Sequence, residues 1–341
     1  MNALLEVKNL YVDLDLPAGV LHAVRDVSFT VEAGKTLSLV GESGCGKSMT
    51  AMAVMGLLPP SASFRARAVN FKGESLLGLS QNQLSRYRGG DMAMIFQEPM
   101  TSLDPCYTIG NQLTEALTAH QKVSAKEARD RAVFLLEKVG ITAAGSRLKQ
   151  YPHQLSGGLR QRIMIAMGLM CGPSLIIADE PTTALDVTIQ AQIMGLLASI
   201  QAEFHMGMIL ITHDLGVVSR VADDVAIMYC GQVVETGTIH EIFNHPIHPY
   251  TRGLMECIPV PGKTEPGEKL GSIPGIVPTP IGDLWGCSFR SRCSRATADC
   301  AHKELGLTPL GENRSYRCIL EPGEIPAPLL HAGAPLSKEV S

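Results

Sequence analysis

Hydrophobic and polar residues alternate along the first part of this chain, and short apolar runs follow further on. The alternation over residues 4 to 31 predicts antiparallel strands. Mainly apolar runs of four or five residues predict buried strands at 36–40, 92–96, 175–178 and 208–212. Longer segments predict helices near 49–58, 126–139 and 188–203, with residues 100–158 largely helical. This order of elements indicates an α/β fold.

The first of these buried strands runs into the segment Gly41 to Ser48, which matches the pattern G-x-x-x-x-G-K-[ST]. Its glycines let successive backbone N–H groups turn toward a phosphate. Lys47 would reach the β- and γ-phosphates, and the Ser48 hydroxyl would ligate Mg²⁺. The alternative is a glycine-rich turn that binds nothing, and the strand–loop–helix setting disfavours it. We expect nucleotide contacts from Gly41, Glu42, Ser43, Gly44, Cys45, Gly46, Lys47, Ser48 and Met49.

Polar residues follow three of the other predicted strands. Asp179 and Glu180 end the run 175–178, and a strand that delivers two acids belongs beside a phosphate loop. Asp179 would hold Mg²⁺, and Glu180 would orient and polarise the attacking water. Gln97 and His213 follow the runs 92–96 and 208–212. Either of these alone is more typical of a surface or satisfied polar residue.

A second anion site is predicted where Leu155 leads into Ser156, Gly157 and Gly158. These residues open a helix that runs to about residue 170, and backbone amides with a hydroxyl at a helix start bind anions. The alternative is an ordinary helix start capped by serine. One chain cannot easily place both anion sites on the same nucleotide. The pair therefore indicates an ATPase that works as a sandwich of two such domains.

Together these segments resemble the ATP-binding cassette (ABC) family of transport ATPases over roughly residues 4 to 256. The resemblance implies a P-loop NTPase fold with a RecA-like core, an antiparallel β subdomain and a helical subdomain that carries the signature motif. It implies ATP hydrolysis with ATP and Mg²⁺. The motifs it assigns are Walker A at Gly41–Ser48, the Q-loop Gln97, the signature Leu155–Gln161, Walker B Asp179 with catalytic Glu180, the D-loop Ala184–Asp186 and the switch His213.

The same resemblance implies how the nucleotide is shared between two chains. Ser156, Gly157 and Gly158 would contact the γ-phosphate held by the opposite Walker A loop, and Gln161 and Asp186 are further expected nucleotide contacts. The chain contains no internal repeat, so a second cassette must come from another chain.

The adenine contact is less clearly indicated than the phosphate contacts. The position where this family commonly stacks an aromatic residue on adenine aligns with Leu14, and Tyr11 lies three residues earlier. Tyr11 is therefore a candidate, with a hydrophobic contact from Leu14 or Val20 as the alternative.

Three further phrases resemble the ATP-binding subunits of dipeptide and oligopeptide permeases, with the D-type subunit closest. They are Gln97–Pro105, Gln232–Gly237 and His245–Thr251. The resemblance implies a peripheral subunit on the cytoplasmic face of the inner membrane that powers peptide uptake. Its expected partners are a related F-type ATPase chain, two transmembrane permease subunits and, indirectly, an extracytoplasmic peptide-binding protein. Other cargo, such as nickel complexes or glutathione, stays open, as does a soluble ATPase outside transport.

Four cysteines close together distinguish the C-terminal part of the chain: Cys287, Cys293, Cys300 and Cys318. Disulfides are disfavoured because nothing suggests secretion. A structural Zn²⁺ site and an iron–sulfur cluster are both compatible with four thiolates, although zinc sites usually contain close C-x2-4-C pairs that are missing here. The family resemblance favours a [4Fe–4S] cluster, with zinc as the alternative. We expect a cassette over 1–256, an extension carrying the cysteines over 257–320, and a flexible tail over 321–341.

Composition limits the remaining classes of function. The chain has 341 residues and a formal net charge of −4, so no basic excess suggests nucleic-acid binding. No uninterrupted apolar run reaches transmembrane length, and the start of the chain does not resemble a signal peptide. We therefore expect a soluble, cytosolic protein that reaches the membrane only through its partners.

Overall fold

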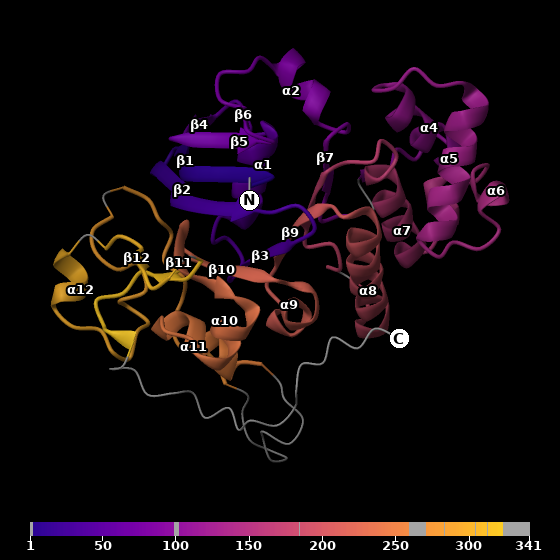
Figure 1. Ribbon diagram of the computed structural model, residues 1–341. Coiled ribbons are helices and arrows are strands. Elements are labelled where there is room, and N and C mark those ends of the chain that lie inside the picture. The colour runs from indigo at the N-terminus through magenta and orange to yellow at the C-terminus, as the bar shows by residue number, and fades with distance from the viewer. Residues whose placement is uncertain are drawn as a thin grey trace. The chain divides into compact units, whose positions relative to one another are not determined.

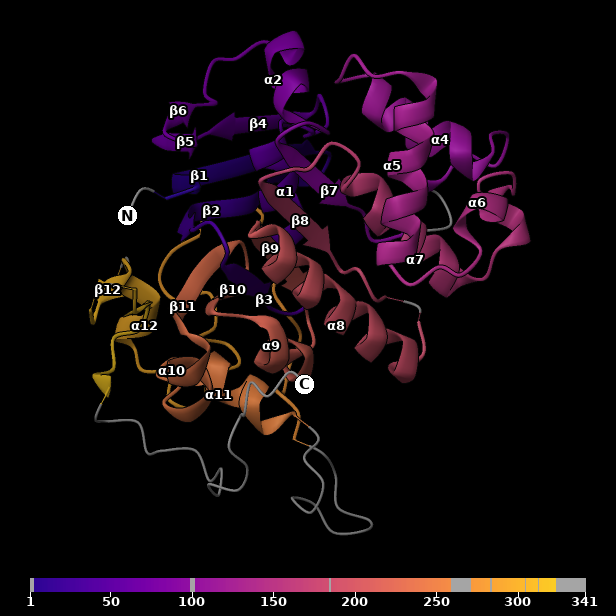
Figure 2. The ribbon, with the colours of Figure 1, turned by 45° about the vertical axis from the view of Figure 1, so that its right-hand side comes forward.

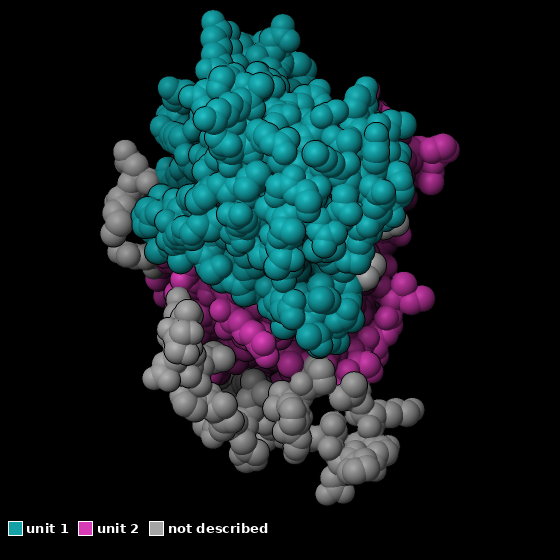
Figure 3. Space-filling view, turned by 90° about the vertical axis from the view of Figure 1, so that its right-hand side faces the viewer, with its two compact units in different colours: residues 1–4, 31–36, 71–211 teal, residues 5–30, 37–70, 212–341 magenta. Residues whose placement is uncertain are grey.

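The computed structural model describes residues 3–98, 102–183, 185–258, 271–282, 284–303, 305–311 and 313–322. The chain forms two compact units, each assembled from separated stretches (Figure 3). Unit 1 contains residues 1–4, 31–36 and 71–211, and unit 2 contains residues 5–30, 37–70 and 212–341. Of the tail predicted over 321–341, all but residues 321 and 322 lies outside the described residues.

Unit 1 is built on parallel strands that are buried along their length. β7 (Met92–Ile95) pairs with β8 (Leu175–Asp179), and β8 pairs with β9 (Gly207–Thr212). In this register Ile177 lies beside Met94 on one side and Ile209 on the other. The apolar runs are uninterrupted because a central parallel strand is covered on both faces. The predicted strands of this region are confirmed.

The other elements of unit 1, among the residues that the structure describes, are mainly helices. They are α2 (Gln81–Tyr87), α4 (Ile109–Thr118), α5 (Ala125–Lys138), α6 (Ala144–Arg147), the 3-10 turn η1 (Pro152–Gln154), α7 (Gly157–Gly168) and α8 (Val187–Phe204), with the short strand β6 (Glu74–Ser75). Figures 1 and 2 show α4, α5, α6 and α7 grouped together. The helical segment predicted over 100–158 is thus confirmed within the described residues.

Local sequence explains where the central helix of this group begins and which side it buries. Ser124 and Glu127 form a capping box at the start of α5, in which the Ser124 hydroxyl accepts the Glu127 N–H at 3.2 Å. Ala128, Ala132 and Leu135 are fully buried on one helical face. That face packs toward α4 and α7, and it supports the helix that carries the signature residues.

Unit 2 contains strands from both ends of the chain. One sheet holds β1 (Leu5–Leu16), β2 (Gly19–Val31), β4 (Ala62–Arg65) and β5 (Ala68–Phe71), in which β1 neighbours each of the others. A second sheet has the order β12-β13-β11-β10-β3, where β3 is Thr36–Val40, β10 is Asp224–Tyr229, β11 is Gln232–Thr238, β12 is Thr308–Pro309 and β13 is Ser315–Tyr316. β3 and β10 are parallel, and β11 returns antiparallel to β10.

The helices of unit 2 are α1 (Lys47–Met55), α9 (Leu215–Val221), α10 (Ile239–Asn244), α11 (Pro249–Glu256) and α12 (Asp299–His302). Three of them, α9, α10 and α11, lie beside β10 and β11 (Figures 1 and 2). Among the residues that the structure describes, no helix is both long and apolar enough to cross a bilayer.

The C-terminal segment is attached to unit 2 by backbone pairing at two places. β13 pairs antiparallel with β11, so that Tyr316 lies opposite Glu235. At the edge of β2, Leu21 forms an antiparallel bridge with Ile281, and the His22 N–H donates to the Pro280 carbonyl at 2.8 Å. The segment after residue 271 therefore extends the sheets of this unit.

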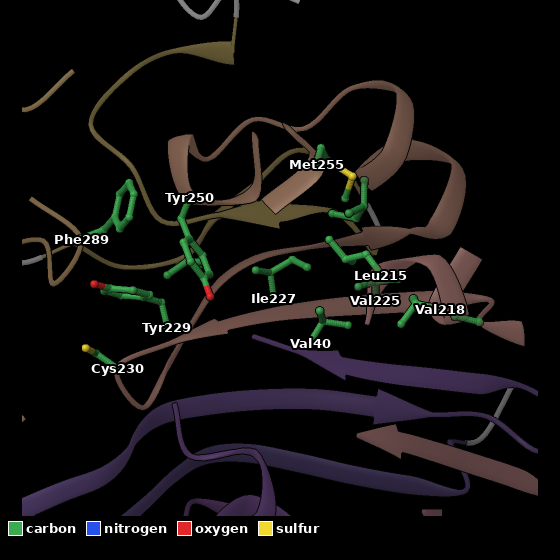
Figure 4. Packing of buried hydrophobic residues seen from close by; sticks show 13 residues of the cluster. Val40, Leu215, Val218, Val225, Ile227, Tyr229, Cys230, Tyr250, Met255 and Phe289 are labelled. Atoms are coloured by element: carbon green, nitrogen blue, oxygen red, sulfur yellow. The ribbon is translucent and has the colours of Figure 1, made fainter. Parts of the chain in front are cut away.

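A cluster of aromatic rings joins the C-terminal segment to the core (Figure 4). Tyr229 on β10, Tyr250 on α11 and Phe289 have ring centroids 4.7 to 5.3 Å apart. All three are buried, and Cys287 and Cys293 pack against the same cluster. Burying a phenylalanine side chain contributes about 1.5–3 kcal/mol, so Phe289 anchors the cysteine-bearing loop to the core.

Candidate functional site

Two glycines of the phosphate loop have no room for a side chain. Gly46, at the start of α1, has φ 100°, and a Cβ there would lie 2.3 Å from the Ala23 carbonyl oxygen. A Cβ on Gly41 would lie 2.2 Å from the carbonyl oxygen of Met228. L side chains rarely adopt the left-handed region, so the loop needs glycine for its backbone path as well as for space.

Lys47 is held by the loop that it belongs to. Its side chain is buried, and its ammonium donates to the carbonyl oxygens of Gly41 at 2.7 Å and Glu42 at 3.1 Å. Ser48 follows at the second position of α1, whose first turn contains no acidic residue. The positive end of this helix and the Lys47 charge thus both point to anion binding. The individual nucleotide contacts of the loop stay predictions.

Unit 1 brings two of the predicted catalytic residues together at the end of β8. The Gln97 side-chain amide donates to the Glu180 carboxylate at 3.1 Å, and the Thr183 hydroxyl donates to the same oxygen at 2.9 Å. Glu180 has φ 45°, and its N–H donates to the Ile211 carbonyl at 2.9 Å. A non-glycine residue in this region costs of order 1–3 kcal/mol, and such strain gathers at functional sites. Asp179, the last residue of β8, is buried beside it.

The signature residues lie in unit 1 at the start of α7. Ser156 is the N-cap, and a Cβ added to Gly158 would lie 3.3 Å from the Ile189 side chain at the start of α8. Asp186 caps α8 by accepting the Ile189 N–H at 2.9 Å. The starts of these two helices are therefore neighbours. Gln161, one turn along α7, is buried, and its side-chain nitrogen donates no hydrogen bond to any described protein atom.

The remaining predicted nucleotide contacts lie in unit 2. His213 directly follows β9 and is exposed. The Tyr11 ring on β1 carries the Arg65 guanidinium 4.2 Å above its centroid. Leu14 lies three residues further along β1, opposite Ala62 of β4. Ala184 of the predicted D-loop is outside the described residues.

The four C-terminal cysteines line one cavity of about 10 Å³. Burial raises the pKa of the Cys287 thiol to about 11, and it also raises the pKa of Cys293 and Cys318. Within the described ranges, no group of three or more His, Cys, Asp or Glu side chains is arranged to hold a metal ion. The four thiols nevertheless border one common space.

His248 also lines the cysteine cavity, and the sequence did not indicate this role. The ring is fully buried, which lowers the pKa of His248 to about 3, and the nearby Arg317 charge adds to the effect. The neutral ring accepts the Tyr250 N–H on Nδ1 at 3.0 Å. The sequence around residue 248 was noted only for its resemblance to peptide-permease subunits. No pattern in the chain predicts that it lies beside residues 287 to 318.

Comparison with known proteins agrees with this arrangement. The profile of the family described as ABC transporter matches residues 24–183, and that described as oligopeptide/dipeptide transporter, C-terminal region, matches residues 234–300. The dipeptide transport ATP-binding protein DppD of Bacillus subtilis is 48% identical over 322 residues, covering 94% of this chain and 96% of the relative. The chain belongs to the ATP-binding proteins of the ABC transporter family. Members of this family hydrolyse ATP, so the chain is an ATPase.

Other relatives extend the comparison. The oligopeptide transport ATP-binding protein OppD of Haemophilus influenzae is 50% identical over 300 residues, covering 88% of this chain and 92% of the relative. Among solved structures, the dimeric structure of MJ0796, a bacterial ABC transporter cassette, has a TM-score of 0.62 at 26% identity. It covers 69% of this chain and 98% of MJ0796. The predicted family and cassette fold are therefore confirmed for this ABC ATPase.

Proposed function

We propose that this ABC ATPase is the ATP-hydrolysing subunit of an importer for dipeptides or oligopeptides. The observation that carries the proposal is the likeness to named peptide-transport ATP-binding proteins, which continues over 94% of the chain and includes the C-terminal region. Other cargo, such as nickel complexes or glutathione, would enter through the same class of assembly. No contact described above favours such other cargo over peptides.

The chemistry proposed for the site follows from the placement of charge. In the phosphate loop, Lys47 and the backbone N–H groups at the start of α1 bind the β- and γ-phosphates. Bound Mg²⁺ would supply charge neutralisation of the phosphate oxygens. Ser48, Asp179 and Gln97 carry the oxygen donors that such an ion prefers, so the residues present fit it.

Glu180 is proposed to orient and polarise the attacking water, with Gln97 and Thr183 fixing its carboxylate. His213 is proposed to face the γ-phosphate. The helix start at Ser156, Gly157 and Gly158, together with Gln161 and Asp186, would serve the nucleotide bound to the partner ATPase chain.

The proposed assembly contains a second, F-type ATPase chain, two transmembrane permease subunits and an external peptide-binding protein. This chain would lie on the cytoplasmic face of the inner membrane as a peripheral subunit. Within it, residues 1–256 would act as the cassette and 257–320 as the permease-specific extension. Closing the two cassettes on ATP and reopening them after hydrolysis would alternate the access of the permease subunits.

The cysteine cavity is proposed to hold a [4Fe–4S] cluster through Cys287, Cys293, Cys300 and Cys318. Four thiols around one cavity are the donor set that such a cluster takes, and the resemblance of the C-terminal region to peptide-permease subunits favours the cluster over one zinc. Arg290 and Arg295 line the same cavity and would offset the negative charge of four thiolates. A single zinc is the alternative, and metal analysis separates the two.

A partner-recovery experiment tests the transport proposal. Affinity purification of the tagged chain from detergent-solubilised membranes of its source cells should recover two integral membrane proteins and a second, non-identical ABC ATPase. A matched Glu180→Gln bait should recover the same set, since the substitution keeps the size of one side chain and changes only its charge. Recovery of no integral membrane protein with either bait would reject the importer assignment and favour an ABC ATPase outside transport.

A further inference from the structure

The second residue of the phosphate loop, Glu42, carries a carboxylate into a site that receives a polyphosphate. Its carbonyl oxygen accepts a hydrogen bond from the Lys47 ammonium at 3.1 Å, so the residue is part of the loop that holds this lysine. Its side chain is partly exposed. Like charges repel, and an uncompensated carboxylate here would lower affinity for ATP.

The C-terminal extension supplies the compensating charge. Nη1 and Nη2 of Arg292 donate to the two carboxylate oxygens of Glu42 at 2.6 and 3.0 Å. The two residues are 250 positions apart in the chain. A bidentate pair of this kind fixes orientation as well as charge, which a lysine cannot reproduce.

Arg292 is itself held firmly. Its Nε donates to the Pro274 carbonyl at 2.9 Å and its Nη2 to the Ile273 carbonyl at 3.1 Å. The guanidinium lies 5.8 Å from the centroid of the Tyr229 ring, within reach of a cation–π interaction. The side chain is only 3% exposed, so its position is fixed by the surrounding residues of the extension.

A second contact fixes the backbone of the same loop residue. The Glu42 N–H donates to the Tyr250 hydroxyl at 3.0 Å, and Tyr250 packs against Phe289 of the cysteine-bearing loop. Glu42 is thus held by its side chain through Arg292 and by its main chain through Tyr250. Both holders lie C-terminal to the phosphate loop by more than 200 residues.

We propose that Arg292 is a positioning residue of the ATP site, which neutralises Glu42 and fixes the first turn of the phosphate loop. The C-terminal extension thereby forms part of the nucleotide site. The inference rests on ATP binding at this loop and is independent of the cargo. Because Arg292 directly precedes Cys293, the arrangement also links the cysteine cavity to the nucleotide site.

The test measures the dissociation constant of Mg·ATP for the full chain by calorimetry. Arg292→Ala should weaken binding about tenfold, the order of a typical coupling between sites. Arg292→Lys should restore part of the loss, because it returns the charge without the bidentate geometry. Adding Glu42→Gln to Arg292→Ala should recover most of it. Lys303→Ala removes an exposed cation of the same extension that pairs with Asp299, and serves as the matched control with unchanged binding.

Glu42→Gln as a single substitution provides a second test. It can be interpreted even if Arg292→Ala unfolds the extension. Charge compensation predicts tighter ATP binding by about twofold to fivefold, since Arg292 is left as a net positive charge beside the phosphates. Weaker ATP binding by Glu42→Gln would show that the pair acts through the geometry of the loop alone, and it would overturn the neutralising role proposed for Arg292. So would a folded Arg292→Ala that binds ATP as the natural chain does. A natural chain that binds no ATP would instead reject the ATPase assignment.

Discussion

The Gln97 amide and the Glu180 carboxylate are joined by a hydrogen bond of 3.1 Å, although 83 residues separate them in the chain. Glu180 occupies a left-handed backbone conformation at the end of β8, which is costly for any residue other than glycine. The bond to Gln97 and the bond from Thr183 hold the carboxylate in one orientation. A carboxylate held in this way is what the proposed role of Glu180, the positioning of a water molecule, requires.

Replacing Glu180 by glutamine should reduce ATP turnover about 10²–10⁴-fold, the usual contribution of a positioned general base. ATP binding should persist, because the phosphate loop is untouched. Steady-state phosphate release and equilibrium binding of ATP measure the two quantities. An unchanged turnover number would remove Glu180 from the catalytic role.

The close approach of Gly46 to Ala23 predicts the effect of a single methyl group. Gly46→Ala must accommodate both φ 100° and a Cβ 2.3 Å from a carbonyl oxygen. We expect a loss of stability of at least about 1–3 kcal/mol and no measurable ATP binding. Gly78→Ala is the matched control, since Gly78 has φ 77° but open space around it. If both variants bind ATP equally well, close packing of the loop does not matter for binding.

The buried carboxylate of Glu235 predicts a pH dependence of stability. Burial raises the pKa of Glu235, although the Ile247 and His248 N–H groups each donate to the carboxylate at 2.8 Å. The folded chain therefore retains a proton that the unfolded chain has already lost. This contribution to stability is complete below the unfolded pKa, about 4.3, and is lost as pH rises through the folded pKa.

Glu235→Gln removes the ionisation and leaves one carbonyl oxygen to accept the two N–H groups. The poorer set of acceptors should lower the free energy of unfolding of the variant by about 1–3 kcal/mol at every pH. The titration of Glu235 in the natural chain adds a second, pH-dependent difference. The stability gap between the natural chain and the variant should narrow as pH rises from 5 to 8. Urea unfolding of both proteins at several pH values measures this difference in free energy of unfolding. Other titrating groups contribute equally to both proteins, so their effects cancel in the difference. A gap that stays constant would show that Glu235 titrates alike in both states.

Metal analysis of oxygen-free protein tests the proposed cluster. We expect about four irons and four acid-labile sulfides per chain, both lost in Cys293→Ser. Cys106→Ser is the matched control, because Cys106 is exposed and far from residues 287–318 in the sequence. One zinc per chain would replace the cluster by a structural zinc site. Metal-free protein would show that the four thiols are unligated.

The sequence predicted those parts of the molecule whose chemistry is written in consecutive residues. The phosphate loop was recognisable in Gly41 to Ser48, because its backbone path needs glycines at fixed positions. The pair Asp179-Glu180 was recognisable because it directly follows an apolar run that predicts a buried strand. The central strands were equally plain, since a strand buried on both faces has no polar alternation. The helix spanned by Ala125–Lys138 was predicted to within one residue.

What could not be predicted depends on contacts between distant residues. The Arg292–Glu42 pair joins two side chains that lie 250 positions apart, and no local sequence pattern indicates that they are in contact. The left-handed conformation of Glu180 is imposed by its surroundings and runs against its intrinsic preference. β12 and β13 are two residues long each, too short for a period of two to be visible, so the pairing of the extension with β11 was missed.

The measurement that tests the central claim most directly is ATP-dependent uptake of a radiolabelled dipeptide. The complex recovered with this chain would be reconstituted into vesicles with ATP on the side of the ATPase and the peptide-binding protein opposite. The account predicts accumulation of dipeptide that needs ATP and is abolished by Glu180→Gln. ATP hydrolysis that Glu180→Gln abolishes, without uptake of dipeptides or longer peptides, would contradict the assignment as a peptide importer.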